Sequence, residues 1–383
     1  MIDTARMLRR STGLGSGLAA DLLEEYAYRY GRTYDSYLVN DADRECFWSR
    51  DGEGAVGFVR RGRYLKVGGG LLAPDECKGA LLAELVEHSE RHGQCLSFYN
   101  VTDDDLPLFR EFGFQVTKWG EEAIVDLPER TWQGKSFEWV RRQTNYCKRQ
   151  GLALEECRRD ELSTVEWGDL LSEFSDMSAA LLAAKPQADE LRFLDGEFDP
   201  SRLGRKRIFV ARADEGTGRV EGFLVANPGG NGSFWSFELY RHRPDAVRGT
   251  VTFLMHQAMR LLAREGVEGV SLCLLPGLRA GEPRPGDSAL ARRGLAWGGR
   301  YFNFLFDTAG LYHFKSRFRP RYENRYICAR PRITLGSAWA LIQILGVLDV
   351  EPRKLARIVG HRCRKWLKRT ALASPESTAR GRE

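Results

Sequence analysis

The sequence predicts an α/β fold in which a mixed, mainly antiparallel sheet is flanked by helices. The main observation is that one order of strand-like and helical segments occurs in both halves of the chain. The length of 383 residues supports it, because this is more than twice a typical domain of about 150 residues. The content of 43% hydrophobic and 29% charged residues is ordinary for a globular protein and excludes a disordered or collagen-like chain.

The first half is expected to begin with a helix at 18–30 and to continue with three strands separated by Arg, Asp and Gly turns. A second helix follows, because apolar residues recur at helical spacing between Leu81 and Val86. The expected strands are 45–49, 54–60, 64–68, 95–101 and 115–127, and the later helices are 74–92 and 106–112.

The second half repeats this order. Its expected helices are 167–183, 249–265 and 287–293, and its expected strands are 207–212, 220–226, 233–240, 269–275 and 300–307. A strand meander followed by helix, strand, helix and strand is the order of the GNAT acyltransferase fold. The duplication therefore predicts tandem GNAT-like domains at 1–130 and 161–333, the second of them catalytic, joined by a basic linker helix at 131–160 and followed by a C-terminal segment at 334–383.

Cysteine and histidine spacing predicts no metal site. The eight cysteines form no CxxC pair and the six histidines no HExxH pattern, so the cysteines are interpreted as mostly buried thiols in a reducing cytoplasm. A signal peptide is not expected, because Asp3, Arg9 and Arg10 interrupt the N-terminal apolar residues.

Positive charge is concentrated at the C-terminal end. Residues 351–383 contain ten Lys or Arg and three acidic residues. The apolar run at 335–348 is fourteen residues long, which is short for a membrane span of about 20 residues. The basic amphipathic stretch at 352–367 has the composition of a helix in an anionic membrane interface. The alternative is a helix that packs on the domain and exposes its basic face.

Two internal segments are rich in cations. In 134–151, Arg141, Asn145, Lys148 and Arg149 fall on one helical face, which indicates either polyanion binding or a solvated linker helix. Segment 310–326 mixes five cations with aromatic residues, a pattern typical of binding to a phosphorylated partner. Its cations are Lys315, Arg317, Arg319, Arg321 and Arg325.

Ionisable residues at the ends of two predicted strands are further candidates. Gly249 and Thr250 begin the long helix where a GNAT enzyme would bind the pyrophosphate of acetyl-CoA, but only Arg248-Gly249 remains of the usual glycine-rich loop. An acetyl-CoA donor is therefore not favoured. Glu238 and Arg241 lie at a strand end as site residues or as a structural ion pair.

The adjacent Glu121 and Glu122 must point to opposite faces of their strand, so both cannot line one pocket. One of them can face the domain interface.

Three blocks together resemble the catalytic domain of the lysylphosphatidylglycerol synthetases, or phosphatidylglycerol lysyltransferases. They are KWGEEAIVDL at 118–127 with the basic segment 134–151, ELYRHRPDAVRGT at 238–250, and GLYHFKSRFRPRYENRY at 310–326. The resemblance covers about residues 20–330 and implies a tandem-GNAT aminoacyltransferase. Such enzymes move an amino acid from aminoacyl-tRNA to a lipid hydroxyl, usually of phosphatidylglycerol.

The resemblance also implies roles for individual residues. Because the aminoacyl ester is already activated, no cofactor and no metal is required. The implied catalytic residues are Glu238, Arg241 and Lys315. The implied substrate or tRNA contacts are Arg141, Arg142, Lys148, Gly249, Thr250, Arg317 and Arg325, and the implied aminoacyl or interface pocket contains Glu121, Glu122, Tyr240 and His242.

Some positions depart from the family pattern. The family's Asp-Leu-Met-Arg is Glu-Leu-Tyr-Arg at 238–241, and its usual Gly-Met-Ala-Pro is Cys-Leu-Leu-Pro at 273–276. An expected acid is Thr252, and an expected Trp is Tyr322. These departures leave the amino acid and the acceptor open. The membrane domain usual in the family is not expected here, which predicts a stand-alone, cytoplasmic protein associated peripherally with the inner face of the cell membrane.

Three other functions remain open from the sequence. They are a tandem-GNAT transferase acting on a peptidoglycan precursor or another amine, an N-acyltransferase using an acyl thioester, and a non-catalytic module that binds RNA or membrane.

Overall fold

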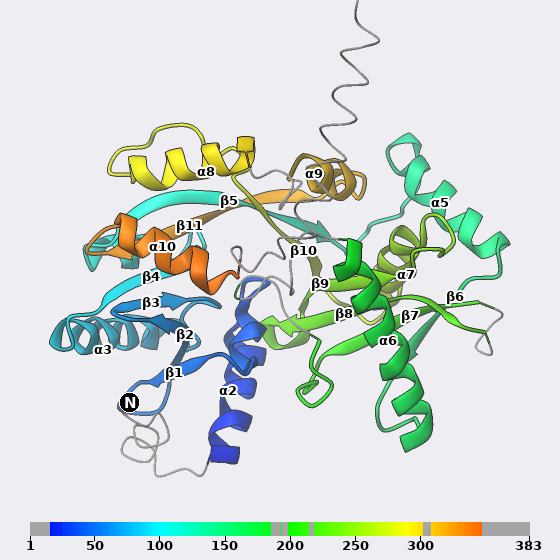
Figure 1. The fold of residues 1–383 in the computed structure, drawn as a ribbon, viewed down its shortest axis with the longest axis horizontal. Helices are drawn as coiled ribbons and strands as arrows, with labels where there is room; N and C mark the ends of the chain where they lie inside the picture. The colour runs from blue at the N-terminus through cyan, green and yellow to red at the C-terminus, as the bar shows by residue number, and fades with distance from the viewer. Residues whose placement is uncertain (1–15, 185–192, 194–197, 214–217, 302–307, 347–383) are drawn as a thin grey trace, which may run out of the picture.

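A computed structural model describes residues 16–184, 193, 198–213, 218–301 and 308–346. Eleven strands of this part of the chain form one continuous sheet, in the order β1-β2-β3-β4-β11-β5-β10-β9-β8-β7-β6 (Figure 1). The strands are β1 (Glu45–Trp48), β2 (Ala55–Arg61), β3 (Tyr64–Val67), β4 (Cys95–Val101), β5 (Gln115–Asp126), β6 (Ala153–Cys157), β7 (Arg207–Arg212), β8 (Val220–Gly229), β9 (Phe234–His242), β10 (Gly269–Pro276) and β11 (Arg321–Arg330).

Each half of the sheet contains one parallel pair. Among the described strands, β3 pairs with β4 and β9 with β10 in parallel, while the other pairings are antiparallel. The prediction of an α/β fold with a mixed, mainly antiparallel sheet is therefore confirmed. A helix connects the two strands of each parallel pair, since parallel neighbours need a long crossover.

The last strand of the described chain lies among the strands of the first half. β11 is antiparallel to both β4 and β5, and it separates them. Residues more than 190 positions apart, such as Ile124 and Arg321, are thereby direct neighbours. The division into two domains stays a prediction, because the sheet runs without interruption through both halves.

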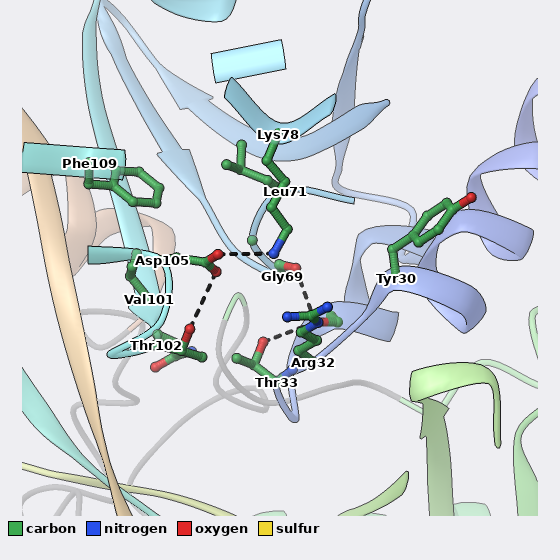
Figure 2. Close-up of a pocket in the computed structure, with 13 residues that line it drawn as sticks. Tyr30, Arg32, Thr33, Gly69, Leu71, Lys78, Val101, Thr102, Asp105 and Phe109 are labelled. Carbon is green, nitrogen blue, oxygen red and sulfur yellow. Dashed lines mark hydrogen bonds and ion pairs between the residues drawn. The ribbon is translucent and has the colours of Figure 1, made fainter. Parts of the chain in front are cut away.

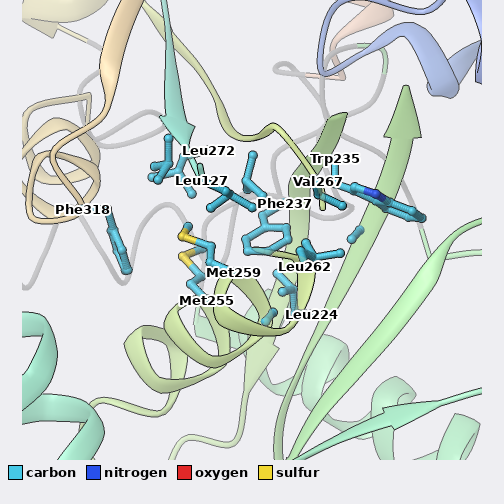
Figure 3. Close-up of a cluster of buried hydrophobic side chains, with 14 of the residues drawn as sticks. Leu127, Leu224, Trp235, Phe237, Met255, Met259, Leu262, Val267, Leu272 and Phe318 are labelled. Carbon is cyan, nitrogen blue, oxygen red and sulfur yellow. The ribbon is translucent and has the colours of Figure 1, made fainter. Parts of the chain in front are cut away.

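Helices cover both faces of the sheet. They are α2 (Ser16–Tyr30), α3 (Lys78–Arg91), α4 (Leu106–Glu111), α5 (Glu138–Arg149), α6 (Thr164–Ala184), α7 (Thr250–Arg264), α8 (Ala289–Tyr301), α9 (Thr308–Ser316) and α10 (Leu335–Ile344). The largest buried cluster of side chains lies beneath α7, where Met255, Met259 and Leu262 pack against strand residues such as Phe237 and against Phe318 (Figure 3). Aliphatic residues at intervals of three and four explain why this helix forms here.

Most predicted elements are confirmed to within a few residues, and the helix expected within 134–151 is present as α5. The strand predicted at 300–307 is wrong at its start, because α8 continues through Tyr301, and residues 302–307 lie outside the described part. Short aromatic runs of this kind are ambiguous between helix and strand. The strands β6 and β11 were not predicted, and the amphipathic stretch at 352–367 is outside the described residues.

A buried lysine anchors α10 to the sheet. The Lys66 ammonium on β3 donates to Ser337 Oγ of α10 at 2.6 Å and to Ser97 Oγ at 3.1 Å. No acidic side chain of the described residues forms an ion pair with it. Burial lowers the pKa of Lys66 from 10.5 to about 7, because the charged form loses hydration.

We expect replacement of Lys66 by Met to change the pH dependence of stability. The unfolded chain keeps the Lys66 proton up to about pH 10.5, whereas the folded chain releases it near pH 7, so the native protein gains stability between these values. On raising the pH from 6.5 to 9.5, the free energy of unfolding of the native chain should rise by roughly 2–4 kcal/mol relative to that of Lys66→Met. Urea unfolding at pH 6.5 and 9.5 measures it, with Lys135→Met as an exposed control. A stability difference that is equal at both pH values would contradict the assignment.

Candidate functional site

The candidate site lies where the parallel strands β9 and β10 part. They pair only through three positions, of which Ser236 and Ser271 are the last. Beyond this point β9 remains paired with β8, and β10 with β5. Ligands of α/β proteins commonly bind beyond the carboxyl ends of strands that diverge in this way.

Irregular pairing marks the same region of the sheet. The register shifts on β9 opposite Val225 and Ala226, where Glu238 is the extra residue, and on β10 between Ser271 and Leu274. Cys273, within the second shift, has a φ of 68°. Bulges re-aim side chains and are frequent next to active sites, so both irregularities support a site here.

Glu238 is held at the contact between the two halves. Asn227 Nδ2, buried on β8, donates to Glu238 Oε2 at 2.6 Å. The neighbouring Ser236 Oγ donates to the Tyr34 carbonyl of the first half at 3.1 Å. The carboxylate therefore has a defined orientation rather than the freedom of a surface side chain.

Lys315 reaches the same region from α9. Its side chain is buried, and its ammonium donates to the carbonyl oxygens of Leu274 at 3.2 Å and Cys273 at 3.4 Å. The thiol of Cys273 in turn contacts the Phe237 carbonyl, 3.5 Å away, next to Glu238. Cys273 thus connects Lys315 of α9 with the β9 backbone next to Glu238, although 77 positions separate Glu238 and Lys315 in the sequence.

Glu121 and Glu122 point in opposite directions, as predicted. Glu121 accepts from Lys118 Nζ at 2.6 Å and from Arg279 Nη1 at 2.9 Å. Glu122 is fully buried, and its two oxygens accept from Ser271 Oγ at 2.5 Å and Arg325 Nε at 2.6 Å.

Arg325 is only 1% exposed, and a second carboxylate, that of Glu323, accepts from its Nη2 at 2.7 Å. The positive charge of Arg325 is therefore neutralised inside the protein, by carboxylates of β5 and β11.

The start of α7 is covered by α5. Gly249 has a φ of 99°, and a Cβ atom at this position would lie 2.8 Å from Gln143 Oε1. The Cys147 thiol contacts the Arg248 carbonyl at 3.6 Å, and Thr250 Oγ1 donates to Val247. Gly249 therefore lies against α5 at the place where a GNAT cofactor phosphate is expected.

One face of α5 is cationic and exposed. Arg142, Lys148 and Arg149 lie on it, whereas the opposite face is buried against α7. There Thr144 Oγ1 bonds His256 Nδ1 at 2.9 Å, and burial lowers the pKa of His256 to about 4, which keeps the imidazole neutral.

The other predicted cations on these helices have local partners. Arg141 Nη1 donates to the carbonyls of Trp132 and Gly134, so it fastens the loop before α5. Arg317 bonds His313 and lies 5.6 Å above the Trp139 ring, joining α9 to α5.

The remaining predicted residues, Tyr240, Arg241 and His242, lie at the C-terminal end of strand β9. Tyr240 packs against the main core, and Arg241 Nη1 donates to the Tyr240 carbonyl. His242 is exposed, and its Nδ1 lies 2.7 Å from the Arg243 carbonyl.

A small polar pocket occupies the equivalent place in the first half, beyond the ends of β3 and β4 (Figure 2). Its charged residues are paired, Lys78 with Asp105 at 2.9 Å and Arg32 with Asp75 at 2.7 Å. The sequence did not reveal this pocket, because its residues come from separate segments.

Two further properties concern metals and membranes. Among the described residues, no three His, Cys, Asp or Glu side chains gather as a metal site would require. The seven described cysteines are free thiols, three buried and four half-buried.

No helix in the described ranges has both the length and the apolarity needed to cross a bilayer.

A family model described as "Phosphatidylglycerol lysyltransferase, C-terminal" matches residues 24–329. The chain belongs to this family. Its description names a lysyltransferase, so the prediction of a transferase is confirmed at the level of the family. A curated phosphatidylglycerol lysyltransferase of Bacillus subtilis is 25% identical over 89% of this chain, and one of Staphylococcus aureus is 26% identical over 80%. The chain spans 39% and 35% of their lengths, respectively.

Solved structures show the same fold. L-PGS from Bacillus licheniformis has a TM-score of 0.70 at 23% identity, covering 87% of this chain and 97% of that one. The C-terminal domain of a putative lysylphosphatidylglycerol synthetase from Agrobacterium fabrum has a TM-score of 0.69 at 22% identity, covering 91% and 98%. The predicted α/β fold class, with a large mixed sheet flanked by helices, is confirmed.

Sequence reasoning missed Asn227 and Ser271. Each is a polar residue inside an apolar strand run, FLVAN for the first and GVSLCLLP for the second. That interruption of an apolar run was the available signal, since buried polar groups need partners.

We expect Glu122→Gln to destabilise the fold by roughly 3–5 kcal/mol, because it leaves Arg325 buried with a weakened partner. The control is Arg321→Met, whose half-exposed pair with Asp126 should contribute less than about 1 kcal/mol. Urea unfolding at pH 7 gives both values. A small, equal effect in the two variants would show that the Glu122–Arg325 pair does not stabilise the sheet.

Proposed function

We propose that this chain transfers an amino acid from aminoacyl-tRNA to a hydroxyl group of a membrane lipid, most simply phosphatidylglycerol. The observation that carries the proposal is that Cys273 connects Lys315 with the β9 backbone next to Glu238, where β9 and β10 part. It gains support from membership of a family whose relatives are named phosphatidylglycerol lysyltransferases.

The reaction would be a direct transfer. The lipid hydroxyl attacks the ester carbonyl carbon of the aminoacyl-tRNA, forming a new C–O bond. The bond to the terminal tRNA hydroxyl then breaks, and that oxygen takes up the proton lost by the lipid. Positioning of the two substrates and stabilisation of the oxyanion would supply most of the rate.

Glu238 would bind the ammonium of the amino acid or assist the proton transfer. The hydrogen bond from Asn227 at 2.6 Å orients the carboxylate, making Asn227 a positioning residue. Burial near the domain contact strengthens electrostatic interactions, because the local dielectric is low.

Lys315 would place positive charge near the developing oxyanion or the lipid phosphate. Its ammonium is already directed at the β10 bulge by two carbonyl oxygens. Arg241 would contribute at the same strand end. We assign Arg325 and Glu122 to the scaffold instead, since they are buried against each other.

The exposed face of α5 would bind the acceptor end of the tRNA. Arg142 and Arg149, seven residues apart, lie on one side of it with Lys148 beside Arg149, so that all three are open to phosphate groups. Arg317, which packs on Trp139 of the same helix, would extend this surface onto α9.

We further propose that the protein works at the inner face of the cell membrane, with an anionic phospholipid surface as partner. A second candidate is transfer to an amine of a peptidoglycan precursor, an acceptor that the sequence leaves open. A thioester donor is not favoured, because α5 covers the start of α7. A lipid product distinguishes the first proposal from these.

Glu238→Gln and Lys315→Met should each lower transfer at least about 100-fold without unfolding the chain. The assay supplies radiolabelled aminoacyl-tRNA and phosphatidylglycerol and follows label into the organic phase, and circular dichroism checks folding. Glu111→Gln on exposed α4 is the matched control. Native-like transfer by both variants would refute the assignment, and label in a peptide rather than a lipid would favour the second candidate.

The pair of substitutions Arg142→Ala and Lys148→Ala should weaken tRNA binding and reduce its salt dependence. Loss of two phosphate contacts should lower the slope of log K against log salt by about 1.5–2. Arg50→Ala with Arg91→Ala, two exposed arginines of the first half, is the control. Filter binding between 50 and 200 mM salt, typical conditions for such titrations, measures the slope. An unchanged slope would exclude the α5 face as the tRNA site.

A further inference from the structure

The first turns of helix α10 expose large apolar side chains and bury small ones. Ser337 and Ala340 face the sheet, whereas Leu335 is 74% exposed and Trp339 is 52% exposed. A helix on a soluble domain normally shows the opposite arrangement. Exposed large apolar groups gathered at one place indicate an interaction surface.

Contacts beneath the helix fix this orientation. Ser337 Oγ accepts from the buried Lys66 ammonium, and a Cβ atom on Gly336 would lie 2.2 Å from the Tyr64 hydroxyl oxygen. Rotation of α10 would break the first contact and create a clash at the second. Leu335 and Trp339, four residues apart and thus on one side, are therefore held outward.

Exposed arginines surround the start of α10. Arg61 lies on the same face of β2 as Val59, which packs in one cluster with Leu341 of α10. The guanidinium of Arg63 lies 5.4 Å above the Tyr64 ring. Arg332 precedes the helix by three residues and is exposed.

None of these three arginines has an ion pair with another described residue. The α10 surface is defined as Leu335, Trp339, Arg61, Arg63 and Arg332.

Tryptophan and leucine beside unpaired arginines suit the interface of an anionic bilayer. Tryptophan favours the headgroup level of membranes, and each cation near an anionic surface strengthens binding. Symmetric pairing with a second copy would instead bring like charges together. The chemistry of the surface therefore favours lipid.

The other end of α10 reaches the candidate site. Ile344 and Leu345 are buried in one cluster with Leu274 of β10, and Cys273 packs against the same cluster. The carbonyls of Leu274 and Cys273 are those that hold Lys315. A helix of ten residues is about 15 Å long.

We infer that the α10 surface binds an anionic phospholipid bilayer and places the membrane about one helix length from Cys273 and Leu274, whose carbonyls hold Lys315. This inference rests on the proposed function insofar as it identifies where the lipid acceptor approaches. Binding of the bilayer itself depends only on the α10 surface.

The test is flotation of the full chain with vesicles of phosphatidylglycerol and phosphatidylcholine. One variant combines Leu335→Ser with Trp339→Ser, and another combines Arg61→Glu with Arg63→Glu. The matched controls are Leu18→Ser with Val165→Ser, which are 61% and 72% exposed, and Arg260→Glu with Arg264→Glu on exposed positions of α7.

Both α10-surface variants should bind the anionic vesicles at least about tenfold more weakly, since each arginine near such a surface is worth roughly fivefold. The controls should bind like the native chain. On vesicles of phosphatidylcholine alone, the arginine reversal should have little effect, because no anionic headgroup is present.

Native-like vesicle binding by both variants would overturn the inference, as would no binding by the native chain or loss of binding only when residues 352–367 are changed. Self-association that both variants abolish, without vesicle binding, would assign the surface to a second copy and also overturn it. Transfer to detergent-dispersed lipid is measured in parallel. If the native chain transfers nothing there, the proposed function fails, while flotation still decides the role of the α10 surface.

Discussion

The buried contact between Glu122 and Arg325 is the interaction on which the rest of the structure depends. It joins β5 to β11, and the hydrogen bond from Ser271 to the other oxygen of Glu122 adds β10. These are the three central strands of the sheet. Because a buried charge is costly without a partner, the triad favours one register for strands that come from distant parts of the chain. The bulge that carries Cys273 begins directly after Ser271.

The fixed register of these central strands explains why the candidate site forms at the contact between the halves. β9 and β10 stop pairing with each other after Ser236 and Ser271. The polar groups beyond this point therefore lie where the two strands no longer form a continuous ladder. Glu238 is oriented from β8, and Lys315 approaches from α9. A site assembled from several elements in this way depends on the whole sheet rather than on one motif.

The surroundings of the two parallel strand pairs differ. In the first half the ends of β3 and β4 form a pocket whose charges neutralise one another. In the second half α5 packs over the start of α7, where a GNAT cofactor is expected. The same packing exposes the cationic face of α5. One helix therefore both covers the start of α7 and presents an exposed cationic surface.

The sequence by itself determined the α/β class, the repeated order of elements and most of their bounds, because helix and strand periodicity are local properties. It also indicated Glu238, Lys315 and the cations of α5, through motifs that resemble one family. Tertiary structure decided which of these residues meet. The sequence predicted both Arg325 and Arg141 to bind a ligand. In the structure Arg325 is buried beside Glu122, and Arg141 fastens the loop before α5. Asn227 and Ser271 gained importance only through contacts with other strands, since pairing partners far apart in sequence leave no local pattern.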